Sequence, residues 1–271
     1  MLKTFFRTYR RGIRRLQARS KGIYSYGDEQ ILIARYIKDL KIESRLCVDI
    51  AASDGRTMSN TYFLFQQGWG GLAVEYDAHQ FARLAQAYRS FPKVNLAKCK
   101  VTPPNVVSLL QANQVPANFG FLNLDIDGYD YFVLEQILKE FRPALICVEV
   151  NEKIPPPVKF TVKWDPDYCW KENHFYGQSL SQLCSLCPVF GYSLIELYYN
   201  NAFLAPSETK AFPVLTPEAA YQKGYLNQPD RKERFPWNAD MEPLLNLPPE
   251  EAVAFINRFF SDRKGQFICS V

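Results

Sequence analysis

Four acidic side chains fall near the ends of short apolar runs that have the length of strands. They are Asp49, Glu75, Asp125 and Glu149, each in or just after a different run. Unpaired charge is unfavourable at the strand ends of a buried sheet. Four acidic residues at four strand ends are therefore more than we expect if these positions are simply solvent-exposed surface. In an open parallel sheet, ligands bind beyond the carboxyl ends of the strands. We therefore expect ligand chemistry where these acids lie.

The turn after the first run has the composition of a ligand-binding loop. Residues 49–55 read Asp-Ile-Ala-Ala-Ser-Asp-Gly, and the small residues Ala51, Ser53 and Gly55 let a ligand approach the backbone. The turn lacks the G-x-G-x-x-G spacing that provides for a pyrophosphate. Glu75 offers a carboxylate that can accept both hydroxyls of a ribose. These features favour S-adenosylmethionine, which has a ribose but no phosphate; the alternative is a tight strand-to-helix connection without a ligand.

Alternating strands and helices must position these residues. Strands are predicted at 46–50, 71–75, 94–98, 119–124 and 144–150, with helices between them at about 58–67, 78–89, 103–113 and 134–141. Such alternation indicates an α/β fold with a parallel sheet covered on both faces. Two further strands, at 192–197 and 202–205, predict an antiparallel hairpin at the sheet edge. The expected core is a doubly wound, mostly parallel sheet of seven strands.

Composition and charge divide the chain into three parts. With 47% apolar and 22% charged residues, the chain is globular. Residues 1–25 are predicted to be a basic amphipathic arm, because residues 1–21 carry eight Lys or Arg and no acid, which leaves a net charge of −4 on the rest. The main domain is expected over 26–205, with an aromatic loop at 151–176. Residues 206–271 are predicted to be a wrapping extension with a C-terminal helix.

Apolar residues recur in the arm at helical spacing, which indicates an N-terminal basic helix. Such a helix can lie on an anionic membrane, act as a targeting segment, bind nucleic acid or pack on its own domain. Nucleic acid is the least favoured partner because no second basic patch with interleaved aromatics follows. Seven cysteines without a secretory signal favour a reducing, cytoplasmic location, with peripheral membrane contact through residues 1–21 as an option. No run approaches the ~18 apolar residues that span a bilayer.

A series of short motifs runs in order through residues 24–205. They are YGDE at 26–29, VDIAASDG at 48–55, SNT at 59–61, GWGG at 68–71 with Glu75, VTP at 101–103, LDIDGYDY at 124–131, EVN at 149–151 and FYGQSL at 175–180. Together they resemble the FkbM-type class I methyltransferases, and SNT with DIDGYDY makes the match specific. The resemblance implies a Rossmann-like enzyme that uses S-adenosyl-L-methionine, typically on an oxygen acceptor.

Cofactor-binding positions follow from the resemblance. They are Asp49, Ala51, Ser53, Asp54, Gly55, Asn60, Thr61, Glu75, Val101 and Asp125. Glu75 is expected to hold the ribose and Val101 to lie near the adenine, while Asn60 and Thr61 either bind the methionine carboxylate or cap a helix. The family often has Gly where Ala51 stands. If that position needs a positive φ, Ala costs roughly 1 kcal/mol there and weakens cofactor binding.

Two acids after the fourth strand and one histidine are the predicted catalytic residues. Asp125 and Asp127 can take a proton from an acceptor hydroxyl or hold Mg²⁺, which would lower the pKa of that hydroxyl. Alternatively, Asp125 holds the amino group of the cofactor; Asp130 is better explained as a helix cap. His174 is a further candidate base or an incidental loop residue. The aromatic side chains of the loop, expected to form a lid, an acceptor wall or simple packing, are Trp164, Tyr168, Trp170, Phe175 and Tyr176.

The sequence thus predicts an S-adenosylmethionine-dependent O-methyltransferase that acts by in-line transfer on a hydroxyl of a sugar, lipid or small metabolite. The alternative is a catalytically silent methyltransferase-fold module that binds at a membrane surface, which Ala51 and the basic arm would allow. A nucleotide-dependent oxidoreductase is disfavoured because the chain has no pyrophosphate turn.

Overall fold

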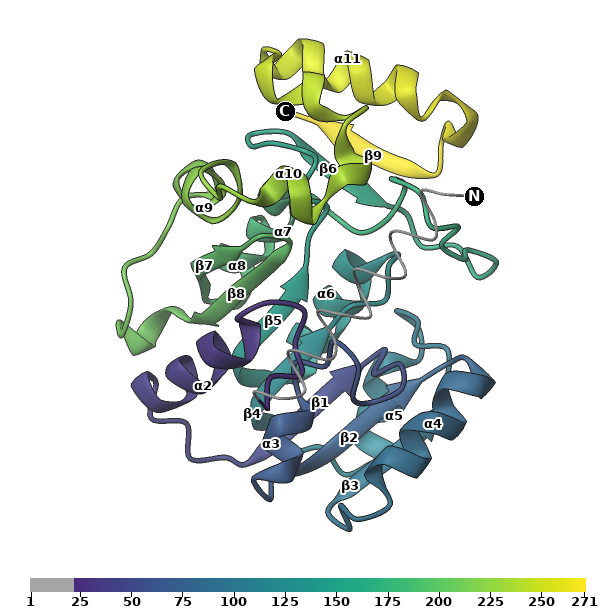
Figure 1. Ribbon diagram of the computed structural model, residues 1–271, viewed down its shortest axis with the longest axis vertical. Coiled ribbons are helices and arrows are strands. Elements are labelled where there is room, and N and C mark those ends of the chain that lie inside the picture. Colours follow the sequence, from purple (N-terminus) through teal and green to yellow (C-terminus); the bar gives the residue numbers. More distant parts are fainter. Residues whose placement is uncertain (1–21) are drawn as a thin grey trace. The chain divides into compact units, whose positions relative to one another are not determined.

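The computed structural model describes residues 22–271 and divides into two compact units, the first ending at Lys100 and the second covering Val101–Val271 (Figure 1). The predicted basic helix of residues 1–21 lies outside the described residues. Between residues 22 and 271, no helix is both long and apolar enough to cross a bilayer.

Seven strands make up the main sheet, in the order β3-β2-β1-β4-β5-β8-β7. They are β1 (Leu46–Ile50), β2 (Gly70–Glu75), β3 (Val94–Lys98), β4 (Asn118–Leu124), β5 (Arg142–Glu149), β7 (Tyr192–Tyr198) and β8 (Asn201–Pro206). The pairs β1–β2, β2–β3 and β4–β5 are parallel, whereas β8 is antiparallel to both β5 and β7. The first five positions follow the order of a doubly wound Rossmann sheet. The predicted Rossmann-like fold with an antiparallel edge hairpin is therefore confirmed.

The first unit adds three helices to β1, β2 and β3. They are α2 (Glu29–Asp39), α3 (Tyr62–Gln66) and α4 (Ala78–Tyr88), and α4 runs beside β2 and β3 in Figure 1. The carboxylate of Asp77 caps α4 by accepting hydrogen bonds from the backbone N–H groups of His79 and Gln80. Helix α3 is shorter than the predicted 58–67 because the hydroxyl of Ser59 accepts the N–H of Tyr62 and holds the preceding residues as a loop.

The second unit surrounds β4, β5, β7 and β8 with helices and a short second sheet. The main helices are α5 (Val106–Ala112), α6 (Asp130–Glu140), α7 (Leu180–Cys184) and α8 (Leu186–Phe190). The apolar spacing of Leu180, Leu183 and Cys187 favours one continuous helix here, but two short ones are present. Pro188 has no N–H to donate to the carbonyl of Cys184, so the α-helical hydrogen bonding ends there.

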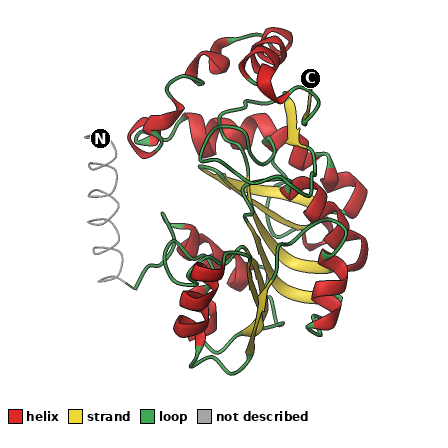
Figure 2. Cartoon of the chain, turned by 90° about the vertical axis from the view of Figure 1, so that its right-hand side faces the viewer, coloured by secondary structure: helices red, strands yellow, loops and turns green. Residues whose placement is uncertain are grey.

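Part of the aromatic loop forms a strand that the sequence did not reveal. Strand β6 (Lys159–Val162) pairs antiparallel with β9 (Phe267–Ser270). Helix α11 (Pro249–Phe259) packs on this pair through a buried cluster that includes Phe160, Ile256 and Phe260. Figure 2 shows β9 at the C-terminus next to helical segments. The remaining short segments are α9 (Pro217–Tyr221), a π-helical turn (Gln222–Leu226), α10 (Arg231–Arg234) and 3₁₀ turns at Ser207–Thr209, Pro236–Asn238, Glu242–Asn246 and Ser261–Arg263.

Candidate active site

The turn after β1 has an unusual backbone. Ala51, Ser53 and Gly55 have φ values of +67°, +50° and +73°, in the left-handed region. A Cβ at Gly55 would lie 2.4 Å from Cδ1 of Leu84 and 2.6 Å from Cε1 of Tyr88, so only glycine fits. Ala51 therefore occupies the conformation in which a glycine would be less strained.

Glu75 ends β2 and is fixed in place by two backbone groups. Its Oε2 accepts a hydrogen bond from the N–H of Ser53 at 2.8 Å, and its Oε1 accepts one from the N–H of Asp77 at 2.6 Å. The residue is 8% exposed. Each carboxylate oxygen keeps a further lone pair, so the oriented group can accept two more hydroxyl donors. This is the arrangement that a ribose needs.

Asp49 and Thr61 are bound to each other inside the first unit. The Thr61 hydroxyl donates to Oδ2 of Asp49 at 2.6 Å, and Thr61 is fully buried. Asn60, the next candidate for the methionine carboxylate, is partly exposed. Of these two polar residues after the turn, Asn60 has the more accessible position.

Asp54 stabilises the turn through hydrogen bonds between its carboxylate and neighbouring residues. Its carboxylate accepts hydrogen bonds from the N–H groups of Arg56 and Thr57, from the Thr57 hydroxyl, and from Arg83 at 2.9 Å. Burial raises the pKa of Asp54, but these hydrogen bonds and the Arg83 charge outweigh it and lower the pKa below its ordinary value. Asp54 is thus ionised at neutral pH and braces the turn.

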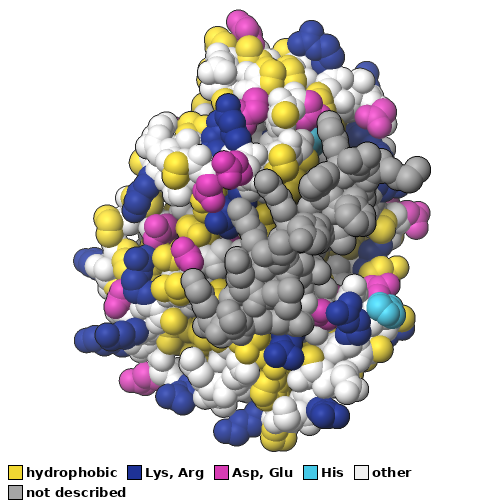
Figure 3. Space-filling view, in the orientation of Figure 1, with side chains coloured by type: hydrophobic (Ala, Val, Ile, Leu, Met, Phe, Trp, Pro, Cys, Tyr) yellow, Lys and Arg dark blue, Asp and Glu magenta, His cyan; other side chains and the backbone are white. Residues whose placement is uncertain are grey.

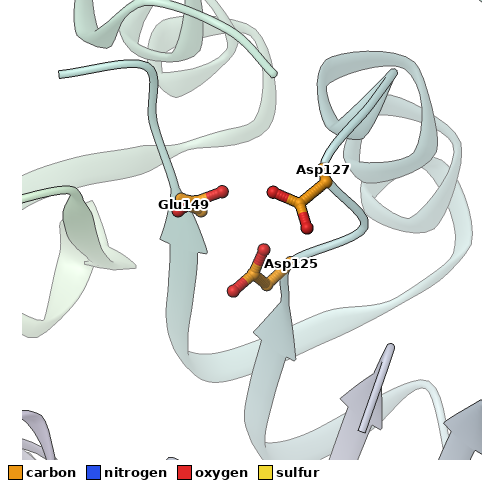
Figure 4. Close-up of side chains that lie close together, drawn as sticks. All are labelled: Asp125, Asp127 and Glu149. Carbon is orange, nitrogen blue, oxygen red and sulfur yellow. The ribbon is translucent and has the colours of Figure 1, made fainter. Parts of the chain in front are cut away.

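In the second unit, three carboxylates lie together beyond β4 and β5. Oxygen atoms of Asp125, Asp127 and Glu149 lie within 4.8 Å of one another (Figure 4). Asp125 follows β4 and Glu149 ends β5. Asp127 lies in the turn between β4 and α6 and has a φ of +52°. The buried Asp130 shapes this turn, because its carboxylate accepts the N–H groups of Ile126 and Gly128 at 2.8 and 2.9 Å. Oxygen donors in this number and spacing also suit a hard divalent cation.

The electrostatics of this cluster favour bound protons. Burial raises the pKa of Asp127 well above its ordinary value, and the charges of Asp125 and Asp130 add to the effect. Burial likewise raises the pKa of Glu149, with contributions from Asp125 and Asp127. Lys153 acts in the opposite direction on Asp127. A carboxylate whose pKa is raised is a stronger base than an ordinary one, which suits a group that accepts a proton.

The second unit also contains Val101 and His174, the predicted adenine contact and the predicted second base. Val101 is buried, and its carbonyl accepts the hydroxyl of Tyr129 at 3.0 Å. The Nε2 of His174 lies 3.0 Å from Oδ1 of Asp240 in the C-terminal extension. Burial and the charge of Lys153 lower the pKa of His174, while Asp240 raises it; the lowering prevails. His174 is therefore a neutral imidazole near pH 7, oriented by a carboxylate.

Tyr168 connects the aromatic loop to the turn that carries Asp127. Its hydroxyl lies 3.0 Å from the carbonyl oxygen of Asp127 and 2.8 Å from that of Phe175, and it can donate to either. Its ring lies against Gly128, where a Cβ would come within 2.9 Å of Cε1. Among the other aromatic residues of the loop, Phe175 and Tyr176 are buried, whereas Trp164 and Trp170 are exposed.

A buried polar network next to these residues was not anticipated from the sequence. The Lys153 ammonium group donates to the hydroxyl of Tyr176 at 2.7 Å and lies 3.3 Å from Oε1 of Glu152, with both charged side chains 1% exposed. Asn238 from the extension donates to the same Glu152 oxygen at 2.6 Å. Adjacent Glu and Lys in a loop normally indicate solvent exposure. Their burial depends on partners that are distant in the sequence, including Tyr176 and Asn238, so the local sequence does not reveal it.

Comparisons with known proteins add the following. No protein-family model matches the chain, and no curated protein is similar to it in sequence. Similar solved structures include the N-terminal domain of EvdMO1 with SAH and D-fucose, an O-methyltransferase from Bacillus cereus in complex with SAH, and an S-adenosylmethionine-dependent methyltransferase from Clostridium acetobutylicum. The EvdMO1 domain has a TM-score of 0.45 at 10% identity, and the match covers 67% of this chain and 83% of that one. The Bacillus cereus enzyme has a TM-score of 0.44 at 13% identity, with 67% and 80% covered. The Clostridium acetobutylicum enzyme has a TM-score of 0.43 at 8% identity, with 73% and 98% covered. The strand order β3-β2-β1-β4-β5-β8-β7 itself defines the Rossmann-like fold of this chain.

Proposed function

We propose that this protein is an S-adenosylmethionine-dependent O-methyltransferase of the FkbM type. The observation that carries the proposal is Glu75, whose carboxylate at the end of β2 is oriented by the N–H groups of Ser53 and Asp77. The left-handed turn after β1 supports it, since small residues there leave the backbone open to a ligand. A Rossmann-like sheet places such features at the strand ends where ligands bind.

The residues of the first unit fit the cofactor by their chemistry. Glu75 would accept the ribose hydroxyls, Asn60 would receive the methionine carboxylate, and the turn from Asp49 to Gly55 would approach the cofactor through its backbone. Thr61 acts by holding Asp49. S-adenosylmethionine supplies an activated methyl group, so the protein needs to orient the acceptor, exclude water and remove one proton. Val101, which the sequence resemblance relates to the adenine, belongs to the second unit.

The carboxylates of the second unit are proposed to receive the acceptor proton. Asp125 is the most exposed of the three and Asp127 and Glu149 lie beside it, so a proton taken at Asp125 can be shared within the cluster. The same oxygen set is suited to Mg²⁺, which would lower the pKa of the acceptor hydroxyl. His174, neutral and oriented by Asp240, is the second candidate base. The acceptor class we propose is a hydroxyl of a sugar, lipid or small metabolite.

Calorimetric titration tests the cofactor assignment. We expect the purified chain to bind S-adenosylmethionine and S-adenosylhomocysteine but not NAD. Glu75→Ala should abolish this binding, whereas Glu43→Ala, which removes an exposed carboxylate of the same unit, should leave it unchanged. Unchanged affinity of Glu75→Ala would remove the ribose role.

One observation favours a second candidate, a catalytically silent binding module. Ala51 has a φ of +67° where glycine would be less strained, which weakens a turn that the cofactor needs. If the folded protein binds neither S-adenosylmethionine nor S-adenosylhomocysteine nor NAD in the same titration, the result would support this second candidate. Its proposed membrane contact rests on the sequence of residues 1–21.

A further inference from the structure

The first unit contains a pocket of about 730 Å³ that has no role in the proposed methyl transfer. One wall is a face of α4, where the short side chains of Ala82 and Ala87 leave space between larger neighbours. Further lining residues come from the loop between β1 and α3 and from Tyr62. Small-molecule sites typically measure about 300–1,000 Å³. The pocket is therefore large enough for an organic ligand of nucleotide size.

The charged groups that line this pocket are mostly arginines. Arg56, Arg83 and Arg89 contribute three guanidinium groups, and Asp54 contributes the one carboxylate. Arg83 is paired with Asp54 at 2.9 Å. Within residues 22–271, neither Arg56 nor Arg89 forms an ion pair with an acid. Two guanidinium groups thus face the pocket without a balancing carboxylate, and the pocket carries a net positive charge.

Two of the three arginines are held in place before any ligand binds. The guanidinium carbon of Arg56 lies 5.6 Å from the ring centroid of Tyr62 and 5.8 Å from that of Tyr24, so cation–π contacts position it. Arg83 is held by Asp54, which is itself fixed by hydrogen bonds from Thr57. A site whose side chains are already ordered loses less conformational entropy when it binds.

We propose that this pocket binds a small molecule through a diphosphate group. Arginine presents a planar fork of N–H donors that matches phosphate oxygens in pairs, and two unbalanced guanidinium charges in one pocket favour a ligand with more than one phosphoryl group. The volume left beside them accommodates an organic part. The proposal does not depend on the methyltransferase assignment. The pocket shares only Asp54 with the proposed cofactor turn, and the Asp54 carboxylate is taken up by Arg56, Thr57 and Arg83.

Calorimetric titration of the full chain with inorganic pyrophosphate tests the proposal, at an ionic strength of about 0.15 M so that loose electrostatic attraction is screened. We expect pyrophosphate to bind the wild type and to bind the double variant R56Q/R89Q at least about tenfold more weakly. Arg45→Gln is the matched control, since Arg45 is an exposed arginine of the same unit outside the pocket. Circular dichroism confirms that each variant is folded.

Three results of the pyrophosphate titrations would overturn the proposal, and a fourth comes from a competitor. The first is no binding by the wild type, and the second is equal affinity of R56Q/R89Q and the wild type. The third is an equal loss in Arg45→Gln, which would indicate diffuse charge rather than a site. Citrate serves as a carboxylate competitor of similar charge, and we expect it to bind more weakly than pyrophosphate. Equal or tighter binding of citrate would exclude phosphate as the recognised group.

Discussion

Ala51 has a backbone conformation that glycine adopts at lower energy. In the left-handed region the Cβ of alanine costs about 1–2 kcal/mol, which a glycine at this position would avoid. Glycine also has more conformational freedom in the unfolded chain, and this offsets part of the stabilisation that the substitution would bring. We therefore expect Ala51→Gly to raise the free energy of unfolding by about 0.5–1 kcal/mol and to tighten S-adenosylmethionine binding. Urea denaturation measures the first effect and calorimetry the second. Ala52→Gly, at a neighbouring position without a positive φ, should be destabilising; a gain there too would contradict the explanation.

Glu149 lies in surroundings that disfavour its charged form. Burial raises its pKa, as do the charges of Asp125 and Asp127. As the pH rises through the ordinary carboxyl range, the unfolded chain releases a proton that the folded chain retains. Glu149 therefore lowers the free energy of unfolding above about pH 4 and has no such effect well below it. We expect Glu149→Gln to raise the Tm at about pH 7, to leave it unchanged at about pH 3, and to reduce methyl transfer.

Differential scanning calorimetry at the two pH values checks this expectation. Glu172→Gln, which changes an exposed carboxylate of the same unit, is the control and should not alter the Tm at either pH. An equal Tm gain for Glu149→Gln at both pH values would show that better packing, rather than the raised pKa, is responsible.

At the scale of elements, Tyr168 attaches the aromatic loop to the turn that carries Asp127. Tyr168→Phe keeps the ring against Gly128 but removes the hydroxyl that reaches the carbonyls of Asp127 and Phe175. We expect a several-fold lower kcat, unchanged S-adenosylmethionine affinity, and faster amide hydrogen exchange in residues 163–173. Tyr131→Phe, which removes a hydroxyl 3.4 Å from that of Ser185, is the control. Loss of cofactor affinity in Tyr168→Phe would indicate a general structural defect instead.

Elements that depend on local patterns were predicted, and those that depend on distant contacts were not. Strands β1 to β5 and the β7–β8 hairpin follow from apolar runs separated by amphipathic helices. Strand β6 forms its ladder with β9, more than a hundred residues further along the chain, so the local sequence of Lys159–Val162 looked like loop. In the candidate site, Glu149 was recognised as a strand-end acid but was given no role. Its proximity to Asp127 depends on a turn with positive φ, which local composition does not reveal.

The whole molecule has an uneven distribution of charge. Its net charge is +4, but residues 1–21 carry eight basic groups, so residues 22–271 carry −4. Figure 3 shows acidic and basic side chains interspersed over the described surface of one face. A body with a net charge of −4 is on balance repelled by an anionic bilayer, so we expect the basic arm to supply the attraction to such a surface. Lys and Arg near an anionic membrane contribute about 1 kcal/mol each.

This asymmetry leads to a prediction for the whole chain. Deletion of residues 1–21 should abolish co-sedimentation with phosphatidylserine-containing vesicles while leaving cofactor affinity unchanged. Replacing the eight basic residues with Gln, which keeps the apolar residues of the arm, separates the two sources of binding: a purely electrostatic attraction would be lost, whereas an amphipathic helix would keep part of it. Neutral phosphatidylcholine vesicles are the control. If the truncated chain binds anionic vesicles as well as the full chain does, the membrane role belongs to the body and the arm serves another purpose.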